Sequence, residues 1–147
     1  PTVVLDRIQD PGNAGTILRS ADAMGVDAVI TSPGSVDMYS PKVVRATAGS
    51  LWHLPLYESH SFSELAQLIP DAKPILLSSH ATTSITELQR SDSYISVFGN
   101  EARGLDESAL GSSVTEVTIP MAGRAESLNL SAAASIVMFT LSSKVAG

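Results

Sequence analysis

The residues with the clearest chemical potential lie in three short loops, each directly after a predicted strand. These loops span residues 9–15, 99–104 and 119–129. In a sheet of parallel strands the carboxyl ends of the strands share one edge, and ligands bind outside that edge. The sequence therefore predicts that three loops distant along the chain converge into one site.

The third loop offers groups that hold a polar ligand without charged side chains. The chain leaves a strand, passes Pro120 and Gly123 and enters a helix, with Ser127 and Asn129 at positions typical of N-cap residues. The free backbone N–H groups at such a helix start can bind a polar ligand. Taken alone, the segment is more typical of a capped C-terminal helix that binds nothing.

The second loop places Glu101 and Arg103 between two glycines, directly after a predicted buried strand. This pattern fits either a ligand-binding loop or a solvated turn in which Arg103 pairs with Glu101 or Asp106. The choice between the two depends on what the other loops bring to the same edge of the sheet.

The first loop contains Gly12 and Gly15 but lacks the G-x-G-x-x-G spacing of dinucleotide-binding folds, and no acidic residue ends the second strand. A Walker A motif is also absent. Asn13 in this loop is typical of a plain turn or of a helix N-cap. The loop therefore gives little support to a nucleotide-binding Rossmann or P-loop function.

The residue inventory disfavours hydrolytic and metal-dependent chemistry. The chain has no cysteine, its three histidines lack metal-ligand spacing, and no Ser-His-Asp triad or clear carboxylate dyad is present. What remains is backbone groups, amides, hydroxyls and arginines. That set suits group transfer from a bound cosubstrate, where positioning supplies most of the catalysis, and we expect no metal.

The hydrophobic pattern predicts one α/β domain over residues 1–147. A strand at residues 2–6, a helix with its apolar face on Ala14, Ile17 and Leu18, and a strand at residues 27–31 form a βαβ unit. Arg19 falls opposite that apolar face. Further strands are predicted at residues 54–57, 73–79, 94–98 and 114–119, helices after Ser40, Ser61, Asp106 and Ser127, and a loop with one helical turn at residues 81–93. The alternation indicates a mainly parallel sheet with helices on both faces.

The composition bounds the partners. No apolar run approaches the roughly 18 residues of a membrane helix, and no signal peptide is visible, so we expect a cytoplasmic protein without a membrane partner. The net charge of −6 argues against nucleic-acid binding by the chain as a whole. Lys42 and Arg45 nevertheless share one short predicted helix. Because the chain begins at Pro1, we expect a missing N-terminal part that carries basic surface.

Three segments, taken in order, resemble the three motifs of the SpoU (TrmH-like) RNA 2′-O-ribose methyltransferases of the SPOUT superfamily. They are Asn13–Gly25, Phe98–Leu105, and Ile119–Gly123 with Ser127–Ser131. The resemblance implies an S-adenosylmethionine cosubstrate and a ribose 2′-hydroxyl acceptor in rRNA or tRNA. It also implies a deep C-terminal trefoil knot, a homodimer with sites at its interface, and a separate N-terminal RNA-binding domain absent from this chain.

The resemblance also assigns roles to individual residues. Arg19 would be the catalytic arginine, serving its own or the partner subunit's site, and Asn13 would help to orient it. Two further groups are implied: a polar network that places the ribose, and a cofactor pocket formed by backbone contacts and apolar packing. The network consists of Glu101, Ser127 and Asn129, and the cofactor pocket of Gly99, Ile119, Met121 and Leu128.

These roles agree with the chemistry of the groups. A ribose hydroxyl is a weak acid, and a nearby guanidinium favours the developing alkoxide. The expected function is therefore methyl transfer to an RNA 2′-hydroxyl, with rRNA as the expected substrate. The alternative is a non-catalytic RNA-binding or ribosome-assembly module with the same fold.

Overall fold

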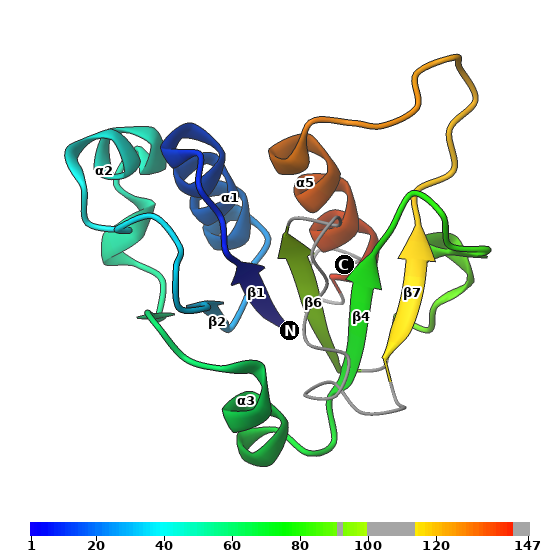
Figure 1. The fold of residues 1–147 in the computed structure, drawn as a ribbon, viewed down its shortest axis with the longest axis horizontal. Coiled ribbons are helices and arrows are strands. Elements are labelled where there is room, and N and C mark those ends of the chain that lie inside the picture. Colours follow the sequence, from blue (N-terminus) through cyan, green and yellow to red (C-terminus); the bar gives the residue numbers. More distant parts are fainter. Residues whose placement is uncertain (91–92, 100–113, 143–147) are drawn as a thin grey trace.

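A single sheet of parallel strands forms the centre of the protein, as the ribbon in Figure 1 shows for the strands it labels. The computed structural model describes residues 1–90, 93–99 and 114–142, so Glu101 and Arg103 lie outside the described residues. Within the described part the strand order is β3-β2-β1-β6-β4-β7-β5, and all neighbours pair in parallel. The strands are β1 Thr2–Asp6, β2 Ala28–Thr31, β3 Leu56–Tyr57, β4 Lys73–Leu77, β5 Thr83–Ser84, β6 Tyr94–Gly99 and β7 Thr115–Thr118.

The order of the strands reverses beside β1. The first three strands run outward from β1 to β3 on one side, whereas β6 pairs with the other side of β1, with Val3 opposite Ser96 and Asp6 opposite Gly99. In open parallel sheets such a reversal leaves a crevice outside the carboxyl ends of the strands. The ends of β1 and β6 therefore border the position at which a ligand site is expected.

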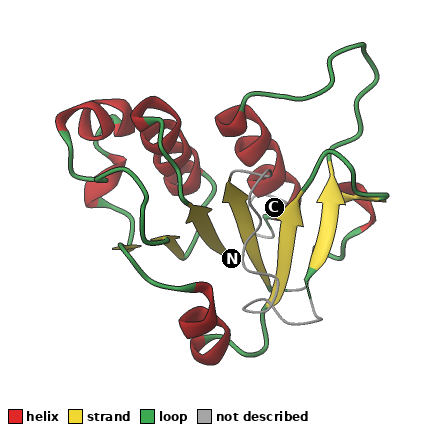
Figure 2. Ribbon diagram, viewed as in Figure 1, coloured by secondary structure: helices red, strands yellow, loops and turns green. Residues whose placement is uncertain are grey.

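Helices cover both faces of the sheet, as Figure 2 shows in red and yellow. Helices α1 and α5 pack on the face that carries Val3 and Leu5 of β1, while α3 packs on the face that carries Val4. The alternation follows from the pleat, because successive residues of a strand point to opposite sides. The helical elements are α1 Pro11–Ala23, α2 Pro41–Thr47, α3 Phe62–Leu68 and α5 Leu130–Leu141, with short 3-10 turns η1 Ser50–Trp52 and η2 Ile85–Glu87. The expected α/β class is confirmed; the knot stays a prediction.

Helix α1 begins earlier than the position of Asn13 suggested. Its N-cap is Asp10, whose carboxylate accepts a hydrogen bond from the Asn13 backbone N–H at 2.9 Å, and Pro11 occupies the first helical position. Asn13 as an N-cap is therefore wrong, and so is a plain turn there, because the residue lies in the first helical turn. Its side-chain amide remains available for a partner outside the helix.

Most other expected boundaries within the described residues agree with the structure, and the helix expected after Asp106 lies outside those residues. Ser61 caps α3 by accepting from the Glu64 N–H, and Gly25 follows α1 with a left-handed φ of 68°. Residues 81–93 were expected to form a loop with one helical turn. The turn is η2, but the region also contains β5, which adds a two-residue edge to β7.

Helices α1 and α2 approach each other closely at Gly15. A β-carbon on Gly15 would lie 2.7 Å from the Val43 carbonyl oxygen of α2 and would overlap Ala46. Since real β-carbons do not come so close to backbone atoms, the contact requires glycine. The close approach fixes the orientation of α1, and with it the direction of Arg19 on its outer face.

Within the described residues, every helix is too short or too polar to pass through a bilayer.

Candidate functional site

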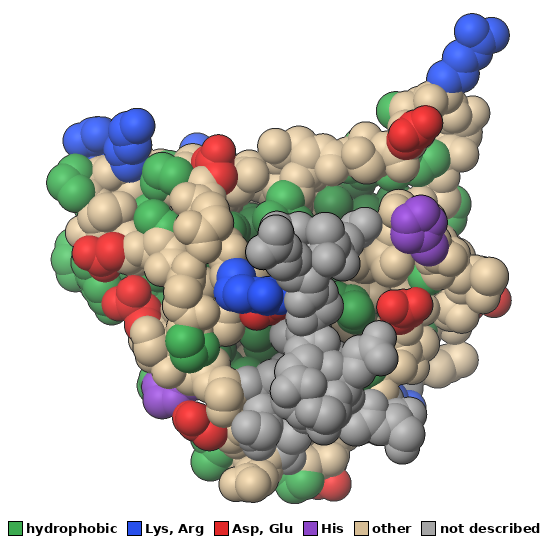
Figure 3. Space-filling view, viewed as in Figure 1, with side chains coloured by type: hydrophobic (Ala, Val, Ile, Leu, Met, Phe, Trp, Pro, Cys, Tyr) green, Lys and Arg blue, Asp and Glu red, His purple; other side chains and the backbone are tan. Residues whose placement is uncertain are grey.

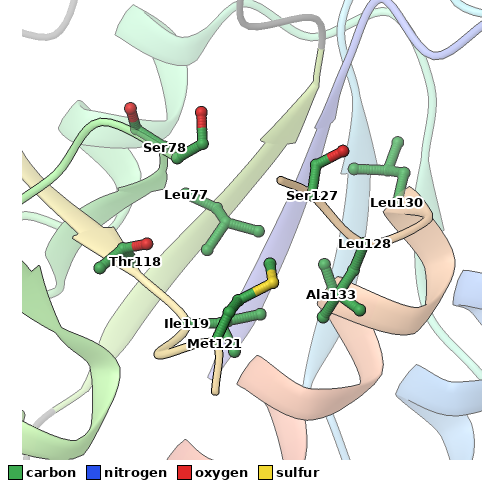
Figure 4. A pocket seen from close by; sticks show the side chains of 10 residues that line it. Leu77, Ser78, Thr118, Ile119, Met121, Ser127, Leu128, Leu130 and Ala133 are labelled. Atoms are coloured by element: carbon green, nitrogen blue, oxygen red, sulfur yellow. The ribbon is translucent and has the colours of Figure 1, made fainter. Parts of the chain in front are cut away.

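A pocket of about 110 Å³ opens at the carboxyl edge of the sheet, between the ends of β4 and β7 and the start of α5 (Figure 4). Three segments form it: the end of β4 and the two residues after it, the start of the loop after β7, and the end of that loop with the first turn of α5. Its lining consists of Leu77, Ser78, Ser79, Thr118, Ile119, Met121, Ser127, Leu128, Leu130 and Ala133.

The walls of the pocket are apolar and its rim carries hydroxyl groups. In Figure 4, Leu77 and Met121 lie opposite Leu128, with the hydroxyls of Ser78 and Thr118 to one side. Met121 is 40% exposed and Leu128 is 38% exposed. Large apolar side chains left this open around a cavity are typical of a surface that a ligand covers. None of the lining residues is charged, so the pocket provides apolar packing and hydrogen bonds rather than acid–base chemistry.

The structure brings three of the four predicted cofactor residues together. Ile119, Met121 and Leu128 line the pocket, and so does Ser127 of the predicted polar network. Gly99 does not belong to the lining. It ends β6 against β1, where a β-carbon would lie 2.6 Å from the Asp6 carbonyl oxygen. Glycine is therefore required there for close strand pairing, whatever its contact with a ligand.

Asn129 joins the pocket loop to α1. Its side-chain oxygen accepts hydrogen bonds from the backbone N–H groups of Ser131 (2.9 Å) and Ala132 (3.4 Å), which makes it the N-cap of α5. Its side-chain nitrogen donates to the Asn13 side-chain oxygen at 3.2 Å. Because Asn13 lies in the first turn of α1, this one bond connects the first and third predicted loops, and their expected convergence is confirmed.

A second polar contact holds the two helices together farther along. The Ser20 and Ser135 hydroxyls lie 2.8 Å apart, and Ser135 also donates to the Ser131 carbonyl oxygen. The small serines let the helices approach closely. At the far ends of the helices the Ser142 hydroxyl donates to the Met24 carbonyl oxygen at 3.2 Å. Helix α5 is therefore joined to α1 by side-chain hydrogen bonds at its start, its middle and its end.

Arg19 lies on the exposed side of α1 and does not line the pocket. Its guanidinium has no hydrogen-bond or ion-pair partner in the described part of the chain. Ala23, one turn further on, is exposed on the same side of the helix, whereas Leu18 is buried in the core. The predicted position of Arg19 opposite the core face is confirmed, and its role stays a prediction.

The sequence reasoning missed the contribution of β4. Leu77, Ser78 and Ser79 line the pocket because β4 pairs with β7, with Leu77 opposite Val117. The predicted strand at residues 73–79 carried a usable signal. Its carboxyl end had to lie at the same edge as the three loops in a parallel sheet. The pairing of β4 with β7 was not visible from the hydrophobic pattern.

Glu64, a carboxylate whose pKa is shifted, lies away from this pocket. Hydrogen bonds from His60 and then Ser61 lower the pKa of Glu64, which sits on α3 on the other face of the sheet. No group of three or more His, Cys, Asp and Glu residues in the described ranges is placed to hold a metal ion. The residues that reach the site are thus neutral side chains, with Arg19 on the neighbouring helix.

Comparison with known proteins gives a consistent result. Residues 1–139 match the model of the SpoU rRNA Methylase family. The 23S rRNA (guanosine(2553)-2′-O)-methyltransferase RlmP of Bacillus subtilis is 33% identical over 140 residues, which cover 95% of this chain and 56% of that protein. The 23S rRNA (uridine(2479)-2′-O)-methyltransferase of Streptomyces viridochromogenes is 34% identical over 144 residues, 93% of this chain and 50% of that protein.

Solved structures agree in fold. The SpoU methyltransferase AviRb from Streptomyces viridochromogenes in complex with the cofactor AdoMet superposes with a TM-score of 0.86 at 30% identity, over all of this chain and 61% of that one. The AdoMet-bound rRNA methyltransferase from Sinorhizobium meliloti gives a TM-score of 0.83 at 32% identity, over 95% of this chain and 54% of that one. The chain spans about half the length of the curated relatives it matches. With a match over residues 1–139 and a shared fold, the chain belongs to the SpoU rRNA methylase family.

Proposed function

We propose that this chain is the catalytic domain of an RNA 2′-O-methyltransferase that uses S-adenosylmethionine and acts on structured RNA, with rRNA as the substrate class. The observation that carries the proposal is the uncharged, half-open pocket at the end of the sheet, tied to α1 by the bond between Asn129 and Asn13. Relatives that share the fold are named as 23S rRNA 2′-O-methyltransferases or carry bound AdoMet. A cytoplasmic location follows from that substrate class.

The pocket has the chemistry that S-adenosylmethionine requires. Leu77, Met121 and Leu128 provide apolar packing for an adenine ring, and hydroxyls and free backbone groups of the loop at residues 119–129 provide hydrogen bonds. Ser127 lines the pocket with its hydroxyl free of any partner in the described residues. When bound, the cosubstrate supplies an already activated methyl group on a positively charged sulfur, so no metal is needed.

In this proposal Arg19 acts on the ribose hydroxyl that accepts the methyl group. Its free guanidinium stabilises negative charge on the ribose oxygen as the hydroxyl loses its proton, which is the electrostatic task of the reaction. Asn13 contributes indirectly, because its bond to Asn129 holds the start of α1 against the pocket loop.

A second copy of the chain completes the site in this proposal. The outer faces of α1 and α5 lie side by side, joined at Ser20 and Ser135, and α5 leaves Ile136 (39%) and Phe139 (51%) exposed there. Arg19 lies on the exposed side of α1 and not in its own pocket. A two-fold dimer through α1 and α5 brings Arg19 of one copy to the pocket of the other. The trefoil knot, the ribose-placing role of Glu101 and an additional RNA-binding domain outside this chain belong to the same proposal.

The test separates binding from catalysis in the full-length protein. Isothermal titration with S-adenosylmethionine should show binding by both the wild type and Arg19→Ala. Transfer of labelled methyl to ribosomal RNA lacking the modification should fall by about 100-fold or more in the variant, the typical cost of removing one charge-stabilising donor. Lys73→Ala, an exposed cation at the amino end of β4, is the control and should keep full activity.

Each outcome has a distinct meaning. If the folded wild-type protein bound no S-adenosylmethionine, the proposal of a methyltransferase would be contradicted. The alternative of a non-catalytic RNA-binding module would then remain. An Arg19→Ala variant with normal transfer would contradict only the assignment of the arginine.

A further inference from the structure

Four cations of the described chain have no partner. Arg7 pairs with Asp6, and Arg90 donates to the carbonyl oxygens of Phe139 and Thr140 at the end of α5. In contrast, four Lys and Arg side chains have neither a hydrogen bond nor an ion pair in the described ranges. They are Arg19, Lys42, Arg45 and Arg124. Free cations on a chain with a net charge of −6 mark places where an anionic partner can bind locally.

Two of these free cations share one short helix. Lys42 and Arg45 lie one turn apart on the exposed side of α2, while Val43 and Thr47 are buried against α1. No acidic side chain lies in the first turn of α2. The helix therefore presents its two positive charges outward together, without a counter-charge of its own.

Two exposed aromatic side chains flank the same helix. Tyr39 directly precedes it and is 52% exposed, and Trp52 follows it in η1 and is 75% exposed. Trp52 is the single tryptophan of the chain. A side chain of this size is seldom left so exposed unless a partner covers it. We call these four residues, Tyr39, Lys42, Arg45 and Trp52, the α2 surface.

Three acidic residues near the α2 surface already have partners: two bind the backbone, and Asp22 lies 3.4 Å from Nδ1 of His53, the residue after Trp52. Asp37 accepts a hydrogen bond from the Tyr39 N–H at 2.9 Å, and Glu58 accepts one from the Met38 N–H at 3.2 Å. Their carboxylates thus hold the segment before α2 in place. Lys and Arg side chains are visible in Figure 3 at the upper left, over the α2 side of the molecule. The loop at residues 119–129 contains one cation, Arg124.

We propose that the α2 surface is an RNA-binding site, in which Lys42 and Arg45 contact phosphates and Trp52 stacks on an unpaired base. Free cations next to exposed aromatic rings are the combination that single-stranded RNA recognition uses. Figure 1 shows α2 and the pocket loop at the same end of the sheet, with α1 and α5 between them. One RNA can therefore contact both places. The inference rests on the proposed function, since it assigns the phosphate and base contacts of the RNA that the pocket modifies.

The first experiment measures RNA affinity against salt in the full-length protein. The probe is an unmodified ribosomal RNA transcript, and the variant is Lys42→Ala/Arg45→Ala. Each lost phosphate contact lowers the slope of log affinity against log salt by about 0.7 to 0.9. We expect the slope of the double variant to fall by close to twice this amount. Its affinity for RNA at low salt should fall by at least about ten-fold. Lys73→Ala, which removes one exposed cation at the amino end of β4, is the control and should keep the wild-type slope.

The second experiment uses Trp52 as its own reporter. Addition of the same transcript should quench tryptophan fluorescence, and the quenched part should be missing in Trp52→Phe. Trp52→Phe should bind RNA almost as well as the wild type, whereas Trp52→Ala should bind about ten-fold more weakly, as loss of one stacked base predicts. Because Trp52 is mostly exposed, neither substitution disturbs the core.

Methylation kinetics distinguish this inference from the proposed function. Lys42→Ala/Arg45→Ala and Trp52→Ala should raise KM for RNA and keep kcat and the affinity for S-adenosylmethionine, whereas Arg19→Ala should lower kcat. The inference would be overturned if Lys42→Ala/Arg45→Ala and Trp52→Ala both bound RNA with the wild-type affinity and the wild-type salt slope. Methyl transfer by the wild-type protein would still support the proposed function in that case. Trp52 fluorescence that changes with protein concentration and not with RNA would assign the surface to a second copy of the chain instead.

Discussion

Asn129 performs two tasks with the two ends of one amide. Its oxygen caps α5, and its nitrogen bonds to Asn13 on α1. An aspartate in this position would keep the cap, because a carboxylate accepts from the same N–H groups, but it would lose the donor. Residue 129 thus allows the cap and the connection between the helices to be tested separately.

Asn129→Asp should therefore cost the protein no more stability than the lost bond to Asn13, because the cap of α5 remains, and it should weaken S-adenosylmethionine binding. One neutral hydrogen bond contributes about 0.5–1.5 kcal/mol, which corresponds to roughly two- to ten-fold in the dissociation constant. Calorimetry on the variant measures both quantities. Asn13→Ala removes the same bond from its other end and should have an effect of similar size.

The double variant Asn13→Ala/Asn129→Asp supplies the control. If the two side chains act through their shared bond, the double variant should bind about as weakly as either single variant. Effects that simply add would contradict the role of this bond.

At the scale of elements, the contact of α1 with α2 at Gly15 determines how α1 lies on the sheet. Gly15→Ala should lower the free energy of unfolding by about 1–3 kcal/mol, since the methyl group has to displace the α2 backbone near Val43. The loss exceeds the gain of up to about 1 kcal/mol that alanine brings to a helix interior. Urea unfolding followed by circular dichroism measures the difference.

Gly12→Ala is the matched control in the same helix. A β-carbon at Gly12 would meet a side-chain atom, the Asp10 oxygen at 3.1 Å, and no backbone of another element. This variant should lie within about 1 kcal/mol of the wild type. Equal destabilisation by both substitutions would show that the close approach of α2 is not the cause.

Local patterns in the sequence predicted the positions of the helices and strands well. They did not predict which distant strands pair with each other. The apolar spacing of Ala14, Ile17 and Leu18 identified α1, and Ser61 marked the start of α3. The position of β4 beside β7 depends on tertiary packing that no window of the sequence contains, so Ser78 was missed. Asn13 was ambiguous because it fits a cap and a turn as well as a helical turn, and the stronger cap at Asp10 decided its place.

At the scale of the whole molecule, the proposed dimer makes a prediction about mixtures. Arg19→Ala removes the arginine but keeps the pocket, while Leu128→Trp is expected to fill the pocket and keep the arginine. Calorimetry first checks that Leu128→Trp no longer binds S-adenosylmethionine. If each arginine serves the opposite pocket, mixing the two inactive proteins should restore roughly a quarter of wild-type activity, because half of the dimers are mixed and each has one intact site.

Two other mixtures fix the interpretation. Either variant mixed with itself should stay inactive, and wild type mixed with Lys73→Ala should stay fully active. A mixture of Arg19→Ala and Leu128→Trp that exchanges subunits but gains no activity would place the arginine in the site of its own subunit.

The position of β6 has a consequence for synthesis of the protein. Its residues, Tyr94–Gly99, pair with β1 on one side and β4 on the other, although both of those strands are made earlier. Until residue 99 has left the ribosome, the three strands β3-β2-β1 can pair with one another, whereas β4 has neither of its two neighbours. We therefore expect the emerging chain to hold a three-stranded partial sheet with an unpaired β1 edge that chaperones can recognise, to add β6 and β4 next, and to complete the sheet only when β7 has been made.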